Sequence, residues 1–531
     1  MPVDAISLEV FKNMFISVAE EMGVALQRTS YSPNIKERRD YSCAVFDPQG
    51  QMVAQAAHVP VHLGAMPASV KAALDTFPRG LKPGDIVILN DPYMGGTHLP
   101  DITMVAPVYL DSGGAKRLVG FVSNRGHHAD VGGMTPGSLP LSTELYQEGT
   151  IIPPIRLARR GRINQEVLQL ICRNSRTPEE RRGDLAAQIA AIRVGERRLR
   201  EVAERYGLPL ALEHMSALLD YSERVTRAAI QAIPDGVYRV FDYMDDDGLS
   251  EQQVPIQVTI TVCGDGMTID FTGTSPQRPG CINAPQAVTM SACLYVIRCV
   301  VGDDAPANQG CLRPLDVITP RGSLVNPEPQ RGVAGGNVET SQRITDVLFA
   351  ALSQALPLLI PASSQGTMNN LLVGGHDPVR DKPFVYYETI GGGMGARPEK
   401  DGISGIQTHM TNTLNTPIEA MEFAFPMRLK RYAIRRGTGG AGKHRGGDGL
   451  VRDVEFLAPA RVTILSERRK LPPPGFHGGH HGETGENVLF RGGYEEVHLA
   501  GKETLDVEPG DILSIRTPGG GGWGEPGTGA A

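Results

Sequence analysis

The chain has 531 residues, 40% of them hydrophobic and 21% charged, a composition typical of a soluble globular protein. Its formal net charge of −7 argues against nucleic acid or an anionic membrane surface as the main partner. No apolar run reaches the ~20 residues that span a bilayer, and no signal peptide is recognisable. Seven scattered cysteines, without a Cys-x-x-Cys pair, favour a reduced, cytoplasmic setting.

Apolar periodicity predicts most of the elements in chain order. A first helix is expected over 4–29, and buried strands are expected over 86–89 and 119–122. Residues 164–233 form a helical segment, and 254–262 alternate as a strand that turns at 264–266 into a hairpin. Helices are expected over 285–300 and 338–357, before a glycine-rich region of strands and turns over 430–524.

This pattern predicts an α+β protein with a large multi-layer fold of mixed sheets and a β-rich, glycine-rich C-terminal part. We divide it into an N-terminal α/β part (1–163), the helical segment (164–233), a central α/β part (234–430) and the C-terminal part (431–531).

Two loops, Asn90 to Asp101 and Ser123 to Gly133, combine imidazole, carboxylate and glycine. Imidazole and carboxylate are ligands of first-row metals, and glycine lets backbone approach a ligand closely. A site built from His98, Asp101 and His127 suits zinc, manganese or iron with a position left for water or substrate. For any one of these histidines alone, the alternative is a strand-end residue bonded to a backbone carbonyl.

Other polar segments accompany these loops. An acidic stretch from Glu37 to Asp40 follows the first helix, and His58 and His62 form a second histidine pair, for which we favour a structural or supporting role. Four polar, glycine-dotted segments are either substrate-binding or simply hydrogen-bonded turns: 335–343, 365–370, 388–397 and 407–413.

Residues 437–444 nearly match the phosphate-binding pattern G-x-x-x-x-G-K-[ST], but His444 replaces the hydroxyl that binds Mg²⁺. The preceding segment, 428–436, is too basic for the buried strand that such a loop follows. We therefore interpret 437–444 as a glycine-rich turn and expect no nucleotide site there.

Several motifs in one order resemble the hydantoinase B/oxoprolinase family over about residues 5–525: the segments 36–42, 90–101, 124–130, 365–370 and 518–524. The resemblance implies a subunit of an ATP-dependent enzyme that pairs with a hydantoinase A-type ATPase of actin-like fold. Members of the family open hydantoins, 5-oxoproline or lactams, and related subunits carboxylate acetone or acetophenone.

The resemblance also implies roles for residues that match the family motifs. His98, Asp101, His127 (in preference to His128) and a carboxylate from Glu37 or Asp40 are then metal ligands.

Asp91 and Asp130 are expected to orient the ligands or to act as general base, and His128 is a further candidate catalytic residue. ATP is expected to be used by the partner, which phosphorylates the ring amide before water completes the opening in this chain.

Three functions are compatible with these motifs. The first is the hydrolytic, B-type subunit of a cyclic-amide hydrolase, which the modest length of 531 residues favours. The second is a subunit of an ATP-dependent ketone carboxylase, and the third is a non-catalytic scaffold for the ATPase. A hetero-oligomer with two or more copies of each chain is expected.

Overall fold

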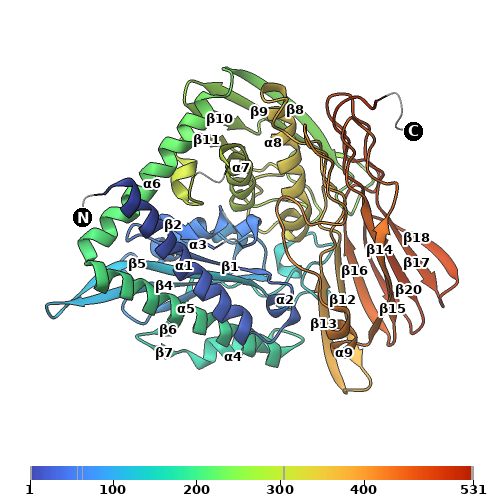
Figure 1. Ribbon diagram of the computed structural model, residues 1–531. Helices are drawn as coiled ribbons and strands as arrows, with labels where there is room; N and C mark the ends of the chain where they lie inside the picture. Colours follow the sequence, from blue (N-terminus) through green and yellow to red (C-terminus); the bar gives the residue numbers. More distant parts are fainter. Residues whose placement is uncertain (1–2, 57, 63, 303–304, 528–531) are drawn as a thin grey trace.

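A seven-stranded antiparallel sheet underlies the N-terminal part in the computed structural model (Figure 1), which describes residues 3–56, 58–62, 64–302 and 305–527. The strand order is β2-β1-β5-β4-β3-β6-β7. The bounds are β1 Tyr41–Phe46, β2 Met52–Gln55, β3 Ile86–Leu89, β4 Asp101–Ser112, β5 Ala115–His127, β6 Ile155–Arg159 and β7 Arg162–Ile163. The strands predicted at 86–89 and 119–122 are confirmed as β3 and part of β5.

Helices cover both faces of this sheet because successive strand residues point to opposite sides. Cys43 and Val45 of β1 join a core with α1 (Ala5–Thr29) and α5 (Pro178–Tyr206), whereas Ala44 and Phe46 join one with α3 (Ala65–Thr76). The predicted helix over 4–29 and helical segment over 164–233 are confirmed as α1 and as α4 (Gln165–Arg173), α5 and α6 (Leu208–Gln231). Within the described ranges, no helix has the length and apolarity to cross a membrane.

A four-stranded mixed sheet, in the order β11-β10-β9-β8, forms the next layer. Its strands are β8 Gly236–Met244, β9 Val254–Cys263, β10 Gly266–Asp270 and β11 Leu315–Ile318, and the predicted hairpin is β9 and β10. Helices α7 (Gln286–Val301) and α8 (Ser341–Ala355) pack against it. A π-helical turn, Gly336–Thr340, precedes α8 where an ordinary helix start was predicted.

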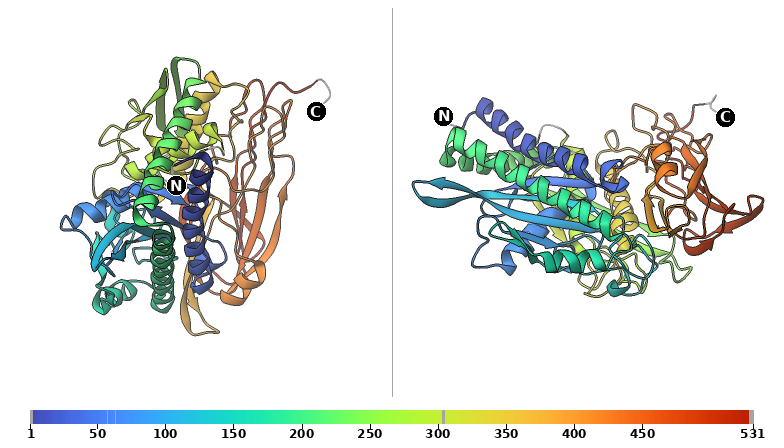
Figure 2. Two further views of the ribbon diagram at one scale, coloured as in Figure 1. Left: turned by 60° about the vertical axis from the view of Figure 1, so that its left-hand side comes forward. Right: turned by 90° about the horizontal axis from the view of Figure 1, so that it is seen from below.

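The C-terminal part consists of two sheets that share one hydrophobic core, at the opposite end of the molecule from α6 and the start of α1 (Figure 2). One sheet is β13-β12-β16-β19 (β12 Asn370–Asp377, β13 Lys382–Glu388, β16 Ala460–Leu465, β19 Lys502–Val507). The other is β14-β15-β20-β17-β18 (β14 Met427–Arg435, β15 Gly449–Phe456, β17 Glu486–Arg491, β18 Glu495–Leu499, β20 Ile512–Arg516), beside α9 (Ile418–Ala424). The first sheet combines strands that precede residue 430 in the sequence with strands that follow it. The four-part division of the chain stays a prediction.

The glycine-rich segment 437–444 is a turn between β14 and β15, as predicted. Its backbone N–H groups bond within the protein: Gly440 N donates to Gly520 O (2.9 Å) and His444 N to Trp523 O (3.0 Å). The segment 518–523 lies directly against backbone, and a Cβ at Gly520 would come within 2.2 Å of Met394 O. Gly521 N also donates to Ser363 O (2.8 Å), which fixes the segment that leads to residues 365–370.

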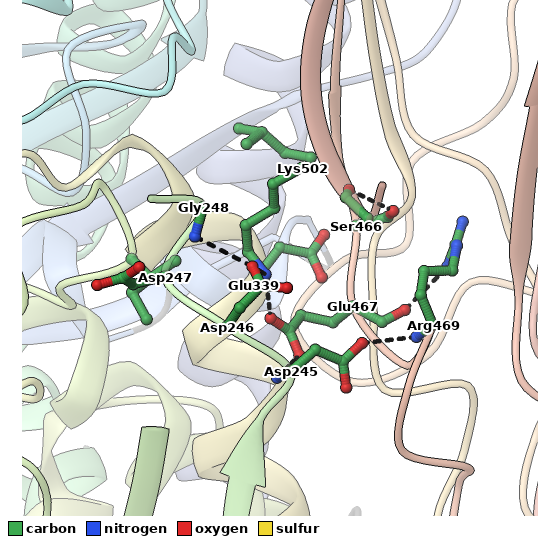
Figure 3. Close-up of polar contacts among 12 residues, drawn as sticks. Asp245, Asp246, Asp247, Gly248, Glu339, Ser466, Glu467, Arg469 and Lys502 are labelled. Carbon is green, nitrogen blue, oxygen red and sulfur yellow. Dashed lines mark hydrogen bonds and ion pairs between the residues drawn. The ribbon is translucent and has the colours of Figure 1, made fainter. Parts of the chain in front are cut away.

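A buried ionic network joins the middle and C-terminal parts (Figure 3). Lys502, at the start of β19, is fully buried and pairs with Glu467 Oε1 (2.5 Å) and Asp246 Oδ1 (3.2 Å). Asp245 Oδ2 accepts a bond from Arg469 N (2.6 Å). Because these groups lie in three different segments, the network holds those segments together.

Glu339 lies beside this network, on the π-helical turn (Figure 3). Its Oε1 accepts bonds from Met368 N (3.1 Å) and Asn370 Nδ2 (2.7 Å). Burial, with the neighbouring charge of Glu467, raises the pKa of Glu339 to about 8.

The network predicts a large stability effect for one lysine and a small one for its neighbour. Lys502→Met leaves Glu467 and Asp246 without their buried cation, which is expected to cost about 3–5 kcal/mol of unfolding free energy. Lys470, which pairs with Asp246 and Glu251 but is 39% exposed, is the matched control, and Lys470→Met is expected to cost less than about 1 kcal/mol. Urea unfolding of both variants measures the difference, and equal midpoints would contradict the assignment.

Glu339 predicts a pH dependence of stability. Its folded pKa of about 8 exceeds the ordinary 4.5, so the stabilisation it provides is complete below pH 4.5 and is lost as pH rises through 8. Glu339→Gln removes this loss. The urea midpoint of the variant is therefore expected to rise relative to that of the wild type between about pH 5 and pH 9. The exposed Glu495 is the control: Glu495→Gln should follow the wild type, and a Glu339→Gln curve parallel to the wild type would refute the prediction.

Candidate metal centre

Three adjacent strands bring Asp40, His127 and Asp101 into one row. In the antiparallel register of β4 and β5, Asp101 lies directly opposite His127. On the other side of β5, His127 N donates to Asp40 O (3.0 Å), just before β1 begins. Directly opposed residues of antiparallel strands point to the same face, so the three side chains converge at the end of the sheet.

The loop before β4 supplies the fourth side chain, His98. Asp91 Oδ1 accepts from Tyr93 N (2.9 Å) and begins a short 3-10 turn, Pro92–Met94. Asn90 Nδ2 donates to Leu99 O (2.7 Å), and Asp101 N donates to His98 O (3.1 Å). These bonds fold the loop back so that His98 reaches Asp101.

The donor atoms of His98, Asp101 and His127 form a nearly regular triangle. His98 Nε2 lies 3.1 Å from Asp101 Oδ1, His127 Nδ1 lies 3.3 Å from the same oxygen, and the two nitrogens are 3.2 Å apart. All three side chains are buried. Asp40 Oδ2 is 4.0 Å from His127 Nδ1, and His62 Nε2 is 3.4 Å from Asp101 Oδ2.

This triangle fits a first-row divalent ion. Neighbouring ligands at about 2.1 Å from such an ion lie about 3.0–3.4 Å apart in octahedral or tetrahedral geometry. Asp101 Oδ1 is buried without a hydrogen-bond partner, although two imidazole nitrogens face it. Burial lowers the pKa of His127, which favours the neutral imidazole that binds metals. Burial opposes the charge of Asp101, but His98 and His62 keep its pKa well below the usual range.

A cavity of about 20 Å³, the space of about one water molecule, adjoins the triangle. Segments far apart in the sequence line it, including parts of all four polar segments for which substrate binding and hydrogen-bonded turns were the alternatives. The polar and sulfur-bearing lining residues are Asp40, His62, Asp101, His127, Asn337, Met368, Tyr387, Thr389, Met410 and Thr411.

The remaining sequence-predicted residues lie outside the cavity. Glu37, half-buried at the end of α2 (Pro33–Lys36), does not line it, whereas Asp40 does. His128 follows His127 and therefore points to the other face of the sheet, where its Nε2 bonds Gln188 Oε1 (2.9 Å). Burial there lowers the pKa of His128 to about 4.

Asp130 and Asp91 support the loops. Asp130 accepts bonds from Arg176 Nη1 (2.9 Å) and Arg176 N (2.8 Å), with further donors at Ser175, Gly132 and Gly137. Asp91 begins the turn before His98, and burial raises its pKa. These contacts make the two carboxylates parts of the loop architecture, at a distance from the cavity lining.

Tyr387 is a site residue that sequence reasoning missed. Its ring stacks on His127 with centroids 4.5 Å apart, and its hydroxyl donates to Asn370 Oδ1 (2.9 Å). Asn370 in turn bonds Glu339. Tyr387 lies in an otherwise ordinary strand 260 residues after His127, so no local pattern marks it.

Comparison with known proteins places this chain in a family. A family model described as hydantoinase B/oxoprolinase matches residues 4–526. The protein 5-oxoprolinase 1 of Arabidopsis thaliana is 43% identical over 98% of this chain, which spans only 42% of the plant protein. A putative B-type subunit of a D-/L-hydantoinase, from Pseudomonas sp. strain NS671, is 34% identical, with 99% of this chain and 90% of that protein covered.

The solved structure of the ATP-dependent caprolactamase from Pseudomonas jessenii shares the fold. Its TM-score is 0.91 at 29% sequence identity, covering 99% of this chain and 92% of that one. The family model, these relatives and the shared fold agree over nearly the whole length. The chain belongs to the hydantoinase B/oxoprolinase family.

Proposed function

We propose that this chain is the hydrolytic subunit of an ATP-dependent cyclic-amide hydrolase that opens a hydantoin, 5-oxoproline or lactam ring. The convergence of His98, Asp101 and His127 beside a small cavity is the observation that carries the proposal. The names of the relatives, which are a 5-oxoprolinase, a hydantoinase component and a caprolactamase, support the substrate class.

In this proposal, ATP is used by a hydantoinase A-type partner. The Pseudomonas relative is named as one subunit of a hydantoinase, which supports an assembly of two kinds of chain. The backbone N–H groups of Gly440 and His444 already donate to other backbone groups, so the segment 437–444 does not offer them to a nucleotide. This supports the use of ATP by another subunit.

The reaction requires activation because an amide carbon is a weak electrophile. Phosphorylation of the amide oxygen makes the ring carbon a better electrophile. Water adds to this carbon with a new C–O bond, and the C–N bond breaks to give an amine and an acyl phosphate. A second water then hydrolyses the acyl phosphate to a carboxylate and inorganic phosphate. A divalent ion in the site would act as a Lewis acid and lower the pKa of water there.

His98, Asp101 and His127 would hold that ion, with Asp40 rather than Glu37 as the nearest further carboxylate. Tyr387 keeps the His127 ring in place by stacking, and Met368 and Met410 add apolar side chains to the cavity lining. We assign Asp91, Asp130 and His128 to supporting the loops and the sheet rather than to the reaction.

Replacement of His127 is expected to weaken metal binding, whereas replacement of its neighbour His128 is expected to leave it unchanged. His127→Ala is expected to lose bound zinc or manganese, with affinity at least tenfold weaker, while His128→Ala keeps the wild-type metal content. Elemental analysis after equilibrium dialysis measures both, with circular dichroism to verify folding. Equal metal content in the two variants would exclude His127 as a ligand.

Reconstitution with the partner predicts the reaction class. With ATP and Mg²⁺, we expect hydantoin, 5-oxoproline or lactam opening without bicarbonate, and we expect it to be abolished by a His98→Ala/Asp101→Ala double variant.

Turnover only with bicarbonate and a ketone would instead identify a component of a carboxylase. Activity that survives the double variant would indicate a scaffold. Product formation followed by mass spectrometry distinguishes these outcomes.

A further inference from the structure

Arg38 is a fully buried cation beside the cavity, in the turn that leads to Asp40. All five of its bonded acceptors are neutral: Leu414 O (3.3 Å), Tyr387 O (3.0 Å), Thr389 Oγ1 (2.8 Å), Thr413 Oγ1 (3.3 Å) and Asn34 Oδ1. Among the described residues, no carboxylate forms an ion pair with it. Burying a charge without a counter-charge is costly, so this arrangement needs an explanation.

The threonine hydroxyls that accept hydrogen bonds from Arg38 form a chain that leads to the cavity. Thr389 Oγ1 accepts from Arg38 Nη2 and from Gln407 Nε2 (3.2 Å), which uses both of its lone pairs. Thr389 must therefore donate its own proton to Thr413 Oγ1, 2.8 Å away. Thr413 then accepts from Arg38 and Thr389, so it donates to Thr411 Oγ1 at 3.4 Å.

This fixed direction leaves the Thr411 O–H without an acceptor in the hydroxyl chain. Thr411 and Thr389 both line the cavity that adjoins the metal triangle. The cavity therefore presents a hydroxyl donor whose polarity is set by a buried guanidinium, an arrangement suited to an anionic oxygen.

The charges around the cavity favour a monoanion. Asp40 and Asp101 are the two carboxylates of the lining, and together they balance one divalent ion. Arg38 then leaves one positive charge uncompensated in a buried site.

We propose that Arg38, acting through Thr389, Thr413 and Thr411, forms a subsite for an anionic carboxylate or phosphoryl group next to the metal triangle. This inference rests on the proposed function and narrows the substrate: either the cyclic amide itself bears a carboxylate, or its phosphorylated form is recognised by the phosphoryl group. Either group is larger than the 20 Å³ cavity, so it enters by displacing the flexible side chains of Met368 and Met410.

Calorimetric binding to the Mn²⁺-loaded chain tests the subsite without requiring turnover. The probes are 5-oxoproline, 2-pyrrolidinone (the same ring without the carboxylate) and inorganic phosphate. We expect at least one anion to bind more tightly than 2-pyrrolidinone. Tight binding of 5-oxoproline with weak binding of phosphate identifies the substrate carboxylate as the ligand. Tight binding of phosphate identifies the phosphoryl group.

Thr411→Val removes the terminal donor at nearly constant volume and is expected to weaken the bound anion about tenfold or more. It should leave 2-pyrrolidinone affinity and Mn²⁺ content unchanged. Thr408→Val is the matched control, since Thr408 is a buried threonine of the same segment that lies outside the cavity lining. The Arg38→Met variant, provided that it folds, should show the same loss of anion affinity.

Anions that bind the wild type no better than 2-pyrrolidinone, or Thr411→Val binding equal to wild type, would overturn the proposal. Because binding is read without the partner and ATP, these outcomes are separate from the fate of the hydrolase proposal. Anion binding without ring opening would reject the hydrolase and keep the subsite; ring opening without anion binding would do the reverse.

Discussion

Backbone hydrogen bonds hold β1, β5 and β4 in register, and this register decides where Asp40, His127 and Asp101 stand. A shift of one residue would turn His127 away and bring His128 to the metal side, because side chains alternate along a strand. Both faces of the sheet are buried under helices, α1 and α5 on one side and α3 on the other. The cost of exposing either apolar face therefore protects the geometry of the donor atoms.

Much of the sheet and helix framework can be predicted from sequence, because long periodic segments such as 4–29 and 254–262 carry their own signal. The metal residues could also be predicted from sequence, since His98, Asp101 and His127 lie in two short loops rich in metal-binding residue types. The choice between His127 and His128 needs the strand register, which depends on pairing with residues far away.

The rest of the site is assembled from positions that no local pattern connects. Tyr387, Asn370 and Glu339 form a hydrogen-bonded series from His127 toward the ionic network around Lys502. Their order in space depends on the π-helical turn and on β12 pairing with β13. The hydroxyl chain at Thr389, Thr413 and Thr411 likewise depends on Arg38, more than 350 residues earlier in the chain.

The position of the glycine segment 518–523 has a consequence for which distant substitutions the site can tolerate. The segment bonds Ser363 and Gly447 by backbone alone and fits between loops where Gly520 admits no side chain. A side chain at Gly520 would push the segment away from Met394 and from Ser363, and so disturb the loop that brings Met368 to the cavity. A position without any metal-binding chemistry is therefore constrained almost as tightly as the ligands themselves.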